Sequence, residues 1–259
     1  LLCRERHFEQ VSAQDRIPMW TRLKMTMRNR VFLMLVAIVF ATVMGFNLVN
    51  NFANYITIFY LFGGEKGEAS QLMGWIGTAW GVTAVVAVFP LNFISARIGK
   101  TRTLLLAIGL MLGAQASKVV CYDPDHPWLL LIPTVMLSAG MLMFFTLASA
   151  MVADVCDADE LETGRRSEGS YYAVFWWFMK MGMAGAYFAA GLLIEATGFD
   201  EQSAIQTDRT LLMLRVFEIG IPILLGLASV AMVLRYPLSE SKAYEIKKAL
   251  DARRGERKA

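Results

Sequence analysis

Six long apolar stretches divide the chain, and polar or charged residues bound each of them. They cover about 31–62, 72–96, 103–121, 128–153, 171–197 and 211–236. A helix needs about 20 apolar residues to cross the hydrocarbon core of a bilayer, whereas a strand of a membrane barrel needs about ten. The lengths therefore predict six transmembrane helices in an all-α membrane protein.

The composition and the placement of charge give this bundle an orientation. Hydrophobic residues make up 56% of the sequence, above the share of about 45–50% that is usual in soluble domains. Most of the 25 lysines and arginines fall in residues 1–30, 97–102, 165–166 and 235–259. Positive charge stays on the cytoplasmic side of a membrane, so we expect a plasma (cytoplasmic) membrane protein with both ends in the cytoplasm. The net charge of +3 is thus a topology signal, and nucleic acid is not an expected partner.

The sequence outside the six stretches predicts two flanking segments. Residues 1–30 are basic, contain no apolar run and begin without Met, which is typical of the end of a central cytoplasmic loop. We therefore expect the chain to be the later half of a longer protein. Residues 31–236 form the bundle, and residues 237–259 form a charged cytoplasmic tail. Tyr244, Ile246 and Leu250 give this tail a thin apolar stripe, which predicts a helix near the headgroups.

The sequence offers no chemistry typical of an enzyme. Its three cysteines and two histidines have no spacing that would hold a metal ion. No nucleophile and base, and no phosphate-binding loop, stand in a plausible position. We therefore expect neither catalysis nor a bound cofactor.

One lysine interrupts the fifth apolar stretch. Lys180 follows Tyr171 by nine residues, about 14 Å along a helix, which puts its ammonium group near the bilayer midplane. A cation there costs from about 3 to more than 10 kcal/mol unless it meets water, an anion or a ligand. Trp176 shares its helical face, with Tyr172 beside it, and aromatic rings stack on sugars or on cations. The lysine therefore either forms an internal ion pair or binds a ligand or a coupling ion.

Four asparagines form a second polar feature, in the first apolar stretch. Asn47, Asn50, Asn51 and Asn54 stand at i, i+3, i+4 and i+7, within roughly a 100° arc of one helix. Asparagine amides form hydrogen bonds between membrane helices, which is one interpretation of the pattern. A polar face that lines a cavity is the other interpretation, and four amides in one arc favour it.

A charged stretch follows the fourth apolar stretch, and we expect it to be a cytoplasmic loop. Its charged residues are Asp154, Asp157, Glu160, Arg165, Arg166 and Glu168. Together with Arg97 they could close a cytoplasmic gate. The alternative is a solvated run of charge, because an exposed ion pair contributes only about 0–1 kcal/mol and several would have to act together. In the sixth stretch, Arg215 and Glu218 at i, i+3 are expected to neutralise each other, with Glu195 nearby.

Two motifs carry a resemblance to a known family. The first reads Asp154-x-x-Asp157-x-x-Glu160-x-x-x-Gly164-Arg165-Arg166-x-Glu168-Gly169-x-Tyr171 and is followed by Lys180. It resembles the glycoside–pentoside–hexuronide:cation symporter family, whose best-known member is the melibiose permease. The second motif, residues 92–102, resembles the signature loop of the major facilitator superfamily. Arg97 and Gly99 match it, while Asn92 and Ala96 replace the expected glycine and aspartate.

The resemblance implies a twelve-helix transporter of which this chain is the last six helices. Those six would form two inverted three-helix repeats, half of a major facilitator superfamily bundle. The family's lysine that matches Lys180 lines the central cavity and affects both sugar and cation handling. The family's cation-binding acidic residues lie in the first half, so the site for the coupling Na+ or H+ would lie mainly outside this chain.

The resemblance therefore predicts cation-coupled symport of a sugar or glycoside by alternating access. The partners would be the lipid bilayer, the small-molecule substrate and the missing N-terminal six-helix half. The expected substrate-binding residues are Lys180, Trp176, Tyr172, Asn47, Asn50 and Asn54. Two alternatives stay open: a symporter of another substrate such as a lysophospholipid, and a six-helix membrane scaffold that transports nothing.

Overall fold

The computed structural model describes residues 19–165, 167–200, 203 and 205–256. Helices make up almost all of this part of the chain, and none of its residues lies in a β-strand. The elements are α2 (Met19–Thr26), α3 (Arg30–Tyr55), the π-helix η1 (Ile56–Leu61), α4 (Lys66–Ile98), α5 (Lys100–Cys121), the 3-10 helix η2 (Pro127–Leu130), α6 (Leu131–Thr163), α7 (Glu168–Ala196), α8 (Asp208–Leu234) and α9 (Glu240–Glu256). The fold is all-α, as predicted.

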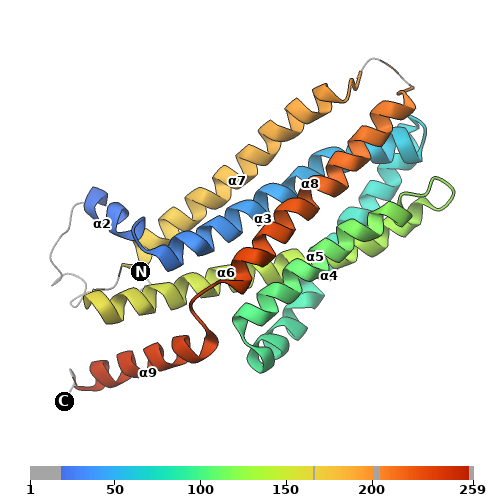
Figure 1. Cartoon of the computed structure of the whole chain (residues 1–259). Helices are drawn as coiled ribbons and strands as arrows, with labels where there is room; N and C mark the ends of the chain where they lie inside the picture. The colour runs from blue at the N-terminus through green and yellow to red at the C-terminus, as the bar shows by residue number, and fades with distance from the viewer. Residues whose placement is uncertain (1–18, 166, 201–202, 204, 257–259) are drawn as a thin grey trace, which may run out of the picture.

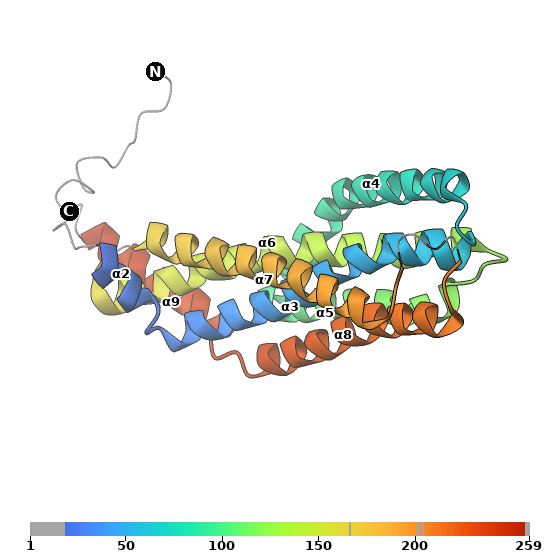
Figure 2. The same cartoon turned by 90° about the horizontal axis from the view of Figure 1, so that it is seen from above.

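Six helical segments of the described chain are long and apolar enough to cross a membrane. They are Arg30–Leu61, Lys66–Ile98, Lys100–Cys121, Pro127–Thr163, Glu168–Ala196 and Asp208–Leu234. Helices α2 and α9 lie at one end of this bundle (Figures 1 and 2), which we call the terminal end. The predicted number of spans is confirmed.

The fourth span corrects the sequence-based prediction of a loop. Helix α6 does not stop near residue 153 but continues to Thr163, so the acidic stretch is helical. Residues 154–163 contain neither glycine nor proline, so nothing in them breaks the helix. Gly164 ends it at φ 71°, a left-handed conformation that glycine adopts without steric cost. The true connection to α7 is therefore a short turn.

The helix pairings follow a twofold pattern. Helix α3 packs against α7 and α8, while α6 packs against α4 and α5. If α3, α4 and α5 are exchanged with α6, α7 and α8 in that order, the first set of pairs becomes the second. The same exchange turns the packing of α5 on α8 into itself. These pairings are the ones expected of two three-helix repeats that interlock in half of a major facilitator superfamily bundle.

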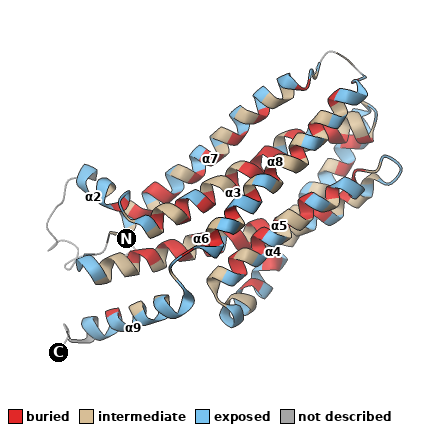
Figure 3. Ribbon diagram, in the orientation of Figure 1, coloured by how far each residue is buried: buried red, intermediate tan, exposed pale blue. Residues whose placement is uncertain are grey.

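The spans differ greatly in how far the bundle covers them (Figure 3). In the most apolar window of each helix, 61% of α3 is buried but only 11% of α4. A buried cluster that includes Phe32, Phe144 and Phe175 joins α3, α6 and α7 near the terminal end. Helix α3 is thus the central element, whereas α4 exposes most of its apolar side chains.

Candidate functional site

Helix α7 has one buried face and one exposed face. Phe175, Met179 and Ala186 are buried, and the backbone at Gly182 lies close to α3. A Cβ atom added at Gly182 would stand 3.2 Å from the carbonyl oxygen of Phe40, so the glycine permits this close approach. The opposite face of α7 is left uncovered by the described residues.

Lys180 lies on that uncovered face, near the middle of α7. Its amine forms no ion pair or hydrogen bond with any residue that the structure describes. The internal ion pair that would make it a purely structural lysine is therefore absent from this part of the chain. Trp176 and Tyr187 flank it on the same face, 50% and 59% exposed. An amine and two aromatic rings thus face outward together at mid-helix.

Tyr172 has a different environment from the one expected of a substrate-binding residue. It is half-buried, and its hydroxyl donates a hydrogen bond of 3.0 Å to the carbonyl oxygen of Ser149 on α6. Its ring also meets Phe175 edge-on, with ring centroids 6.4 Å apart. Tyr172 therefore fastens α7 to α6, and Trp176 is the more accessible aromatic neighbour of Lys180.

The four asparagines of α3 divide into two pairs. Asn47 is buried and donates to the carbonyl oxygen of Val43 at 2.8 Å, and Asn51 donates to the carbonyl oxygen of Asn47 at 3.1 Å. Both amides therefore bond their own helix. They neither join two helices nor point outward toward a cavity. Asn50 and Asn54 are exposed, one turn apart. The outward-facing part of the predicted polar face is limited to these two.

The charged residues of the predicted gate lie on two helices and one turn. Asp154, Asp157 and Glu160 belong to the last turns of α6, and Glu168 begins α7. A carboxylate in the first turn of a helix interacts favourably with the helix dipole. Arg165 is exposed in the turn between the helices. Arg166 lies outside the described residues.

Lys100, and not Arg97, contacts the first of these carboxylates. Lys100 Nζ lies 2.6 Å and 2.7 Å from the two carboxylate oxygens of Asp154, which joins the start of α5 to α6. The guanidinium of Arg97 instead stacks over the ring of Phe93 at 4.0 Å. In this structure Lys100, and not Arg97, is therefore the cation that reaches Asp154, and a role of Arg97 in the gate stays a prediction.

The tail joins the same cluster. Glu240, at the start of α9, accepts a hydrogen bond of 2.9 Å from the backbone N–H of Lys100, where a carboxylate also complements the α5 dipole. Burial, together with the nearby Asp154 carboxylate, raises the pKa of Tyr236 well above its usual value. A small cavity lies among Lys100, Asp154, Tyr236 and Glu240. The sequence motif identified Asp154 but gave no sign of Glu240.

Helix α9 is more closely attached to the bundle than the sequence suggested. It packs on α6, and Leu250 of its apolar stripe is buried. Tyr244, in contrast, is 71% exposed, so the three-residue stripe does not act as one surface. The tail is helical over Glu240–Glu256, as predicted, and it packs on α6. The last three residues of the predicted tail, 257–259, and residues 1–18 of the predicted basic segment lie outside the described part of the chain.

The structure contains a buried ion pair between α5 and α8 that the sequence did not predict. Glu218 forms an ion pair with Lys118 of α5, with 2.5 Å between Nζ and Oε1, and not with Arg215 as predicted. The guanidinium of Arg215 lies 4.3 Å from the centre of the Tyr60 ring. Glu195 is exposed and forms no ion pair within the described residues. Lys118 was the available signal, because it stands at the same end of the bundle as Glu218. The pair was missed because the two residues lie 100 positions apart in the sequence.

The described residues contain no group of three or more histidine, cysteine, aspartate or glutamate side chains that could hold a metal ion. The site therefore consists of an outward amine with aromatic neighbours on α7, two outward amides on α3, and a charge cluster at the terminal end.

Residues 3–240 match the family described as MFS/sugar transport protein. The chain belongs to this family. The membership inferred from the Asp154–Lys180 motif is thereby confirmed, and the name describes a transporter family and not an enzyme family.

Three curated relatives of this chain carry the name symporter. An uncharacterized symporter of Synechocystis sp. is 27% identical over 244 residues, covering 92% of this chain and 44% of the relative. The uncharacterized symporter YnaJ of Bacillus subtilis is 26% identical over 222 residues, covering 85% and 46%. The uncharacterized symporter YjmB of Bacillus subtilis is 21% identical over 245 residues, covering 94% and 51%. The chain thus spans about half the length of the relatives it matches.

Proposed function

We propose that this chain is the C-terminal six-helix half of a secondary active transporter that carries a sugar or glycoside together with Na+ or H+. The substrate would bind near the bilayer midplane, between this bundle and a second six-helix bundle. Rocking of the two bundles around that site would expose it to each side in turn. The protein would reside in the plasma membrane, with both ends of this chain in the cytoplasm.

The observation that carries the proposal is the exposure of Lys180. Its amine lies in the middle of an apolar helix, and the described residues offer it no anion. In contact with lipid, such a cation would cost at least about 3 kcal/mol. A second bundle that encloses a wet cavity would remove this cost. The half-length match to proteins named symporters independently supports a second bundle.

The exposed groups suit a polyhydroxylated substrate. Lys180 can donate hydrogen bonds to hydroxyl or carboxylate oxygens, and the ring of Trp176 can stack on the C–H face of a sugar. Asn50 and Asn54 add donors and acceptors from α3. Tyr172 and Asn47, whose groups are already bonded within the bundle, would support these side chains and not contact the substrate directly.

The acidic residues at the terminal end would form part of the cytoplasmic gate. The ion pair between Lys100 and Asp154, together with Glu240, already joins α5, α6 and α9. Asp157, Glu160, Glu168, Arg165 and Arg166 would extend this cluster toward the other bundle when the cytoplasmic side closes. The coupling cation would bind mainly in the other bundle.

The experiment is uptake of radiolabelled sugars into vesicles that contain the longer protein, with Na+ and H+ gradients imposed separately. Cation-driven uptake that Lys180→Ala abolishes is the expected result. Lys66→Ala is the matched control, because Lys66 is exposed at the start of α4, away from the middle of the span. Absence of flux for every sugar and gradient would favour a scaffold. Uptake of a lysophospholipid alone would change the substrate class.

A further inference from the structure

A second group of polar and charged residues lies between α5 and α8, at the opposite end of α5 from Lys100. We call it the α5–α8 charge cluster, and its members are Gln115, Lys118, Tyr122, Arg215 and Glu218. Glu218 is fully buried, and Lys118 is 6% exposed. The Nζ atom of Lys118 donates to Oε1 of Glu218 at 2.5 Å. This bond ties the last turn of α5 to α8.

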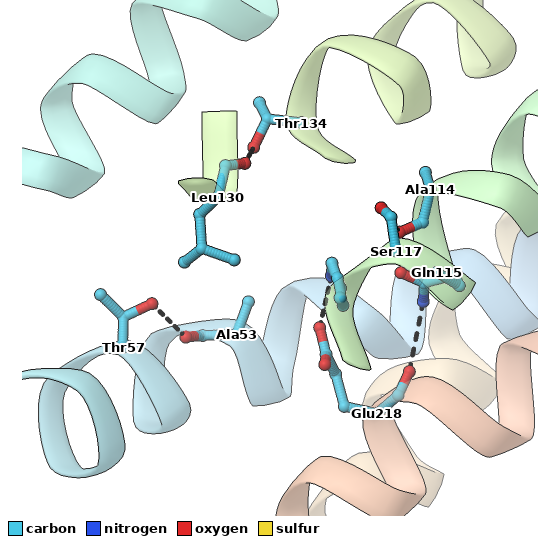
Figure 4. Close-up of polar contacts among 9 residues, drawn as sticks. Ala53, Thr57, Ala114, Gln115, Ser117, Leu130, Thr134 and Glu218 are labelled. Carbon is cyan, nitrogen blue, oxygen red and sulfur yellow. Dashed lines mark hydrogen bonds and ion pairs between the residues drawn. The ribbon is translucent and has the colours of Figure 1, made fainter. Parts of the chain in front are cut away.

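The bonding of Glu218 is incomplete. Gln115 donates to its backbone carbonyl oxygen at 3.2 Å (Figure 4), but its second carboxylate oxygen, Oε2, is buried without a hydrogen-bond partner among the described residues. The Nε atom of Arg215 is also buried without such a partner. A buried donor or acceptor left unpaired in this way is costly. One free acceptor and one free donor are therefore present on the same helix.

These two unpaired atoms belong to neighbouring side chains. Residues three apart on a helix share a face and lie within reach of each other, so Glu218 can turn its carboxylate toward Arg215 without any movement of the backbone. In the observed arrangement, the guanidinium of Arg215 is held over the ring of Tyr60 at 4.3 Å and near the ring of Tyr122 at 6.0 Å. Arg215 thus stands three residues from Glu218 on α8 and forms no ion pair with a residue that the structure describes.

The cluster offers the carboxylate of Glu218 a cation on each of two helices. Lys118 and Arg215 carry two positive charges, while Glu218 carries the single negative charge of the cluster. Lys118 stands in the last turn of α5, so its flexible stem could extend the amine to the end of the bundle if Glu218 turned away. Arg215 does not have to move when Glu218 turns away from it, because its guanidinium already stacks on the ring of Tyr60. The carboxylate therefore has one partner on α5 and one on its own helix.

We propose that Glu218 exchanges between Lys118 and Arg215, and that the exchange makes or breaks a charged tie between α5 and α8. The observed arrangement is the tied one. In the other arrangement Glu218 bonds within α8, Lys118 extends toward water, and only neutral contacts join the two helices. Those contacts include the bond from Gln115 and the close packing of Leu112 on Gly226. The inference goes beyond the proposed transport function and does not depend on it.

A double-mutant cycle tests the exchange in the full chain reconstituted in lipid nanodiscs. Lys118→Met and Arg215→Met each remove one cation and keep an apolar stem. Each single change should be tolerated, because Glu218 retains the other partner. The double change leaves the carboxylate unpaired, so the melting temperature should fall by about 5 °C more than the sum of the single shifts. Additive shifts would overturn the proposal. Lys66→Met is the matched control and should leave the melting temperature unchanged.

Distances between spin labels provide a second test that does not require the double variant to fold. Labels would be placed at Val119→Cys and Leu212→Cys, exposed positions of α5 and α8, after the native cysteines are changed to alanine. The parent protein should show a shorter and a longer distance. Arg215→Met should leave only the shorter distance, and Lys118→Met only the longer one. A single distance that is the same in all three proteins would overturn the exchange.

Discussion

Two lysines interrupt apolar helices of this bundle, and the structure treats them in opposite ways. Lys118 is buried between α5 and α8 and forms an ion pair with Glu218. Lys180 is exposed on α7, and no described residue offers it an anion. Both are expensive to place in a membrane, but only Lys118 has an anionic partner among the described residues. Lys118 therefore joins two helices, whereas Lys180 would, under the proposed function, be accommodated by the cavity between two bundles.

The comparison shows why the sequence alone could not separate the two roles. Each lysine is surrounded by apolar residues in the sequence, and each stands within a long helix. The difference arises from α8, which brings Glu218 to one lysine from a hundred residues away. The predictions below change one of the two environments at a time, from the largest expected effect to the smallest.

Removing the anion from the buried pair should have the largest effect on stability. Glu218→Leu removes the one carboxylate of the α5–α8 charge cluster and leaves both Lys118 and Arg215 without an anion there, and losing one member of a buried pair costs about 3–5 kcal/mol. Replacing both residues, as Lys118→Met with Glu218→Leu, should recover most of that loss because no uncompensated charge remains in the pair. Thermal unfolding in nanodiscs measures both. An equal loss in the single and double variants would contradict the comparison.

Removing the exposed Lys180 should reduce transport and leave stability almost unchanged. Under the proposed function, Lys180→Ala should lower cation-driven uptake by at least about tenfold, which corresponds to about 1.4 kcal/mol of lost interaction. The free energy of unfolding should change by less than about 0.5 kcal/mol, as for other exposed residues. Uptake and thermal unfolding are measured on the same preparation. A large loss of stability with unchanged uptake would reverse the assigned roles.

Breaking the ion pair at the terminal end should change the free energy of unfolding by an amount between those expected for Glu218→Leu and Lys180→Ala. The side chains of Lys100 and Asp154 are 30% and 19% exposed, so solvent screens part of their attraction. Asp154→Asn should therefore destabilise the protein by no more than about 1 kcal/mol. It should also increase the labelling of cysteines introduced at the terminal end, because the α5–α6 connection loosens. Arg97→Gln is the control, since Arg97 stacks on Phe93 and should leave the labelling unchanged.

The asparagines should give the smallest effect. Asn54→Ala removes an exposed amide and should weaken substrate binding by about threefold, the value of one modest hydrogen bond. Asn51→Ala removes an amide that bonds its own helix, so it should leave affinity unchanged. Substrate-dependent quenching of tryptophan fluorescence would measure both affinities. A larger effect at Asn51 would show that the two pairs of asparagines have been assigned to the wrong roles.

Hydrophobic length predicted the spans well, because a membrane helix must be continuous and apolar. It failed at the end of α6, where the charged residues 154–163 suggested a loop. Polarity is a poor boundary signal there, since a helix ends at a residue that breaks it and Gly164 is the first such residue. The motif drew attention to the acidic residues at the end of α6. It could not show that Lys100 and Glu240 complete the cluster, because both come from distant parts of the chain.

Residue spacing within one helix predicted the wrong partner where a residue of another helix was within reach. Arg215 and Glu218 have the spacing of a helical ion pair, but Lys118 on α5 takes the carboxylate and Tyr60 takes the guanidinium. The asparagine arc differs, since Asn47 and Asn51 bond carbonyl groups of their own helix and not a tertiary partner. Periodicity thus indicated which residues share a face of a helix, but not which neighbour each face would meet.

The sparse covering of α4 has a consequence for how the protein is made. A helix with so little contact inside its own bundle must enter the bilayer on the hydropathy of its own sequence, without help from neighbours that emerge later from the ribosome. Its outer face, rich in valine and aromatic side chains, then stays open to lipid until another surface arrives.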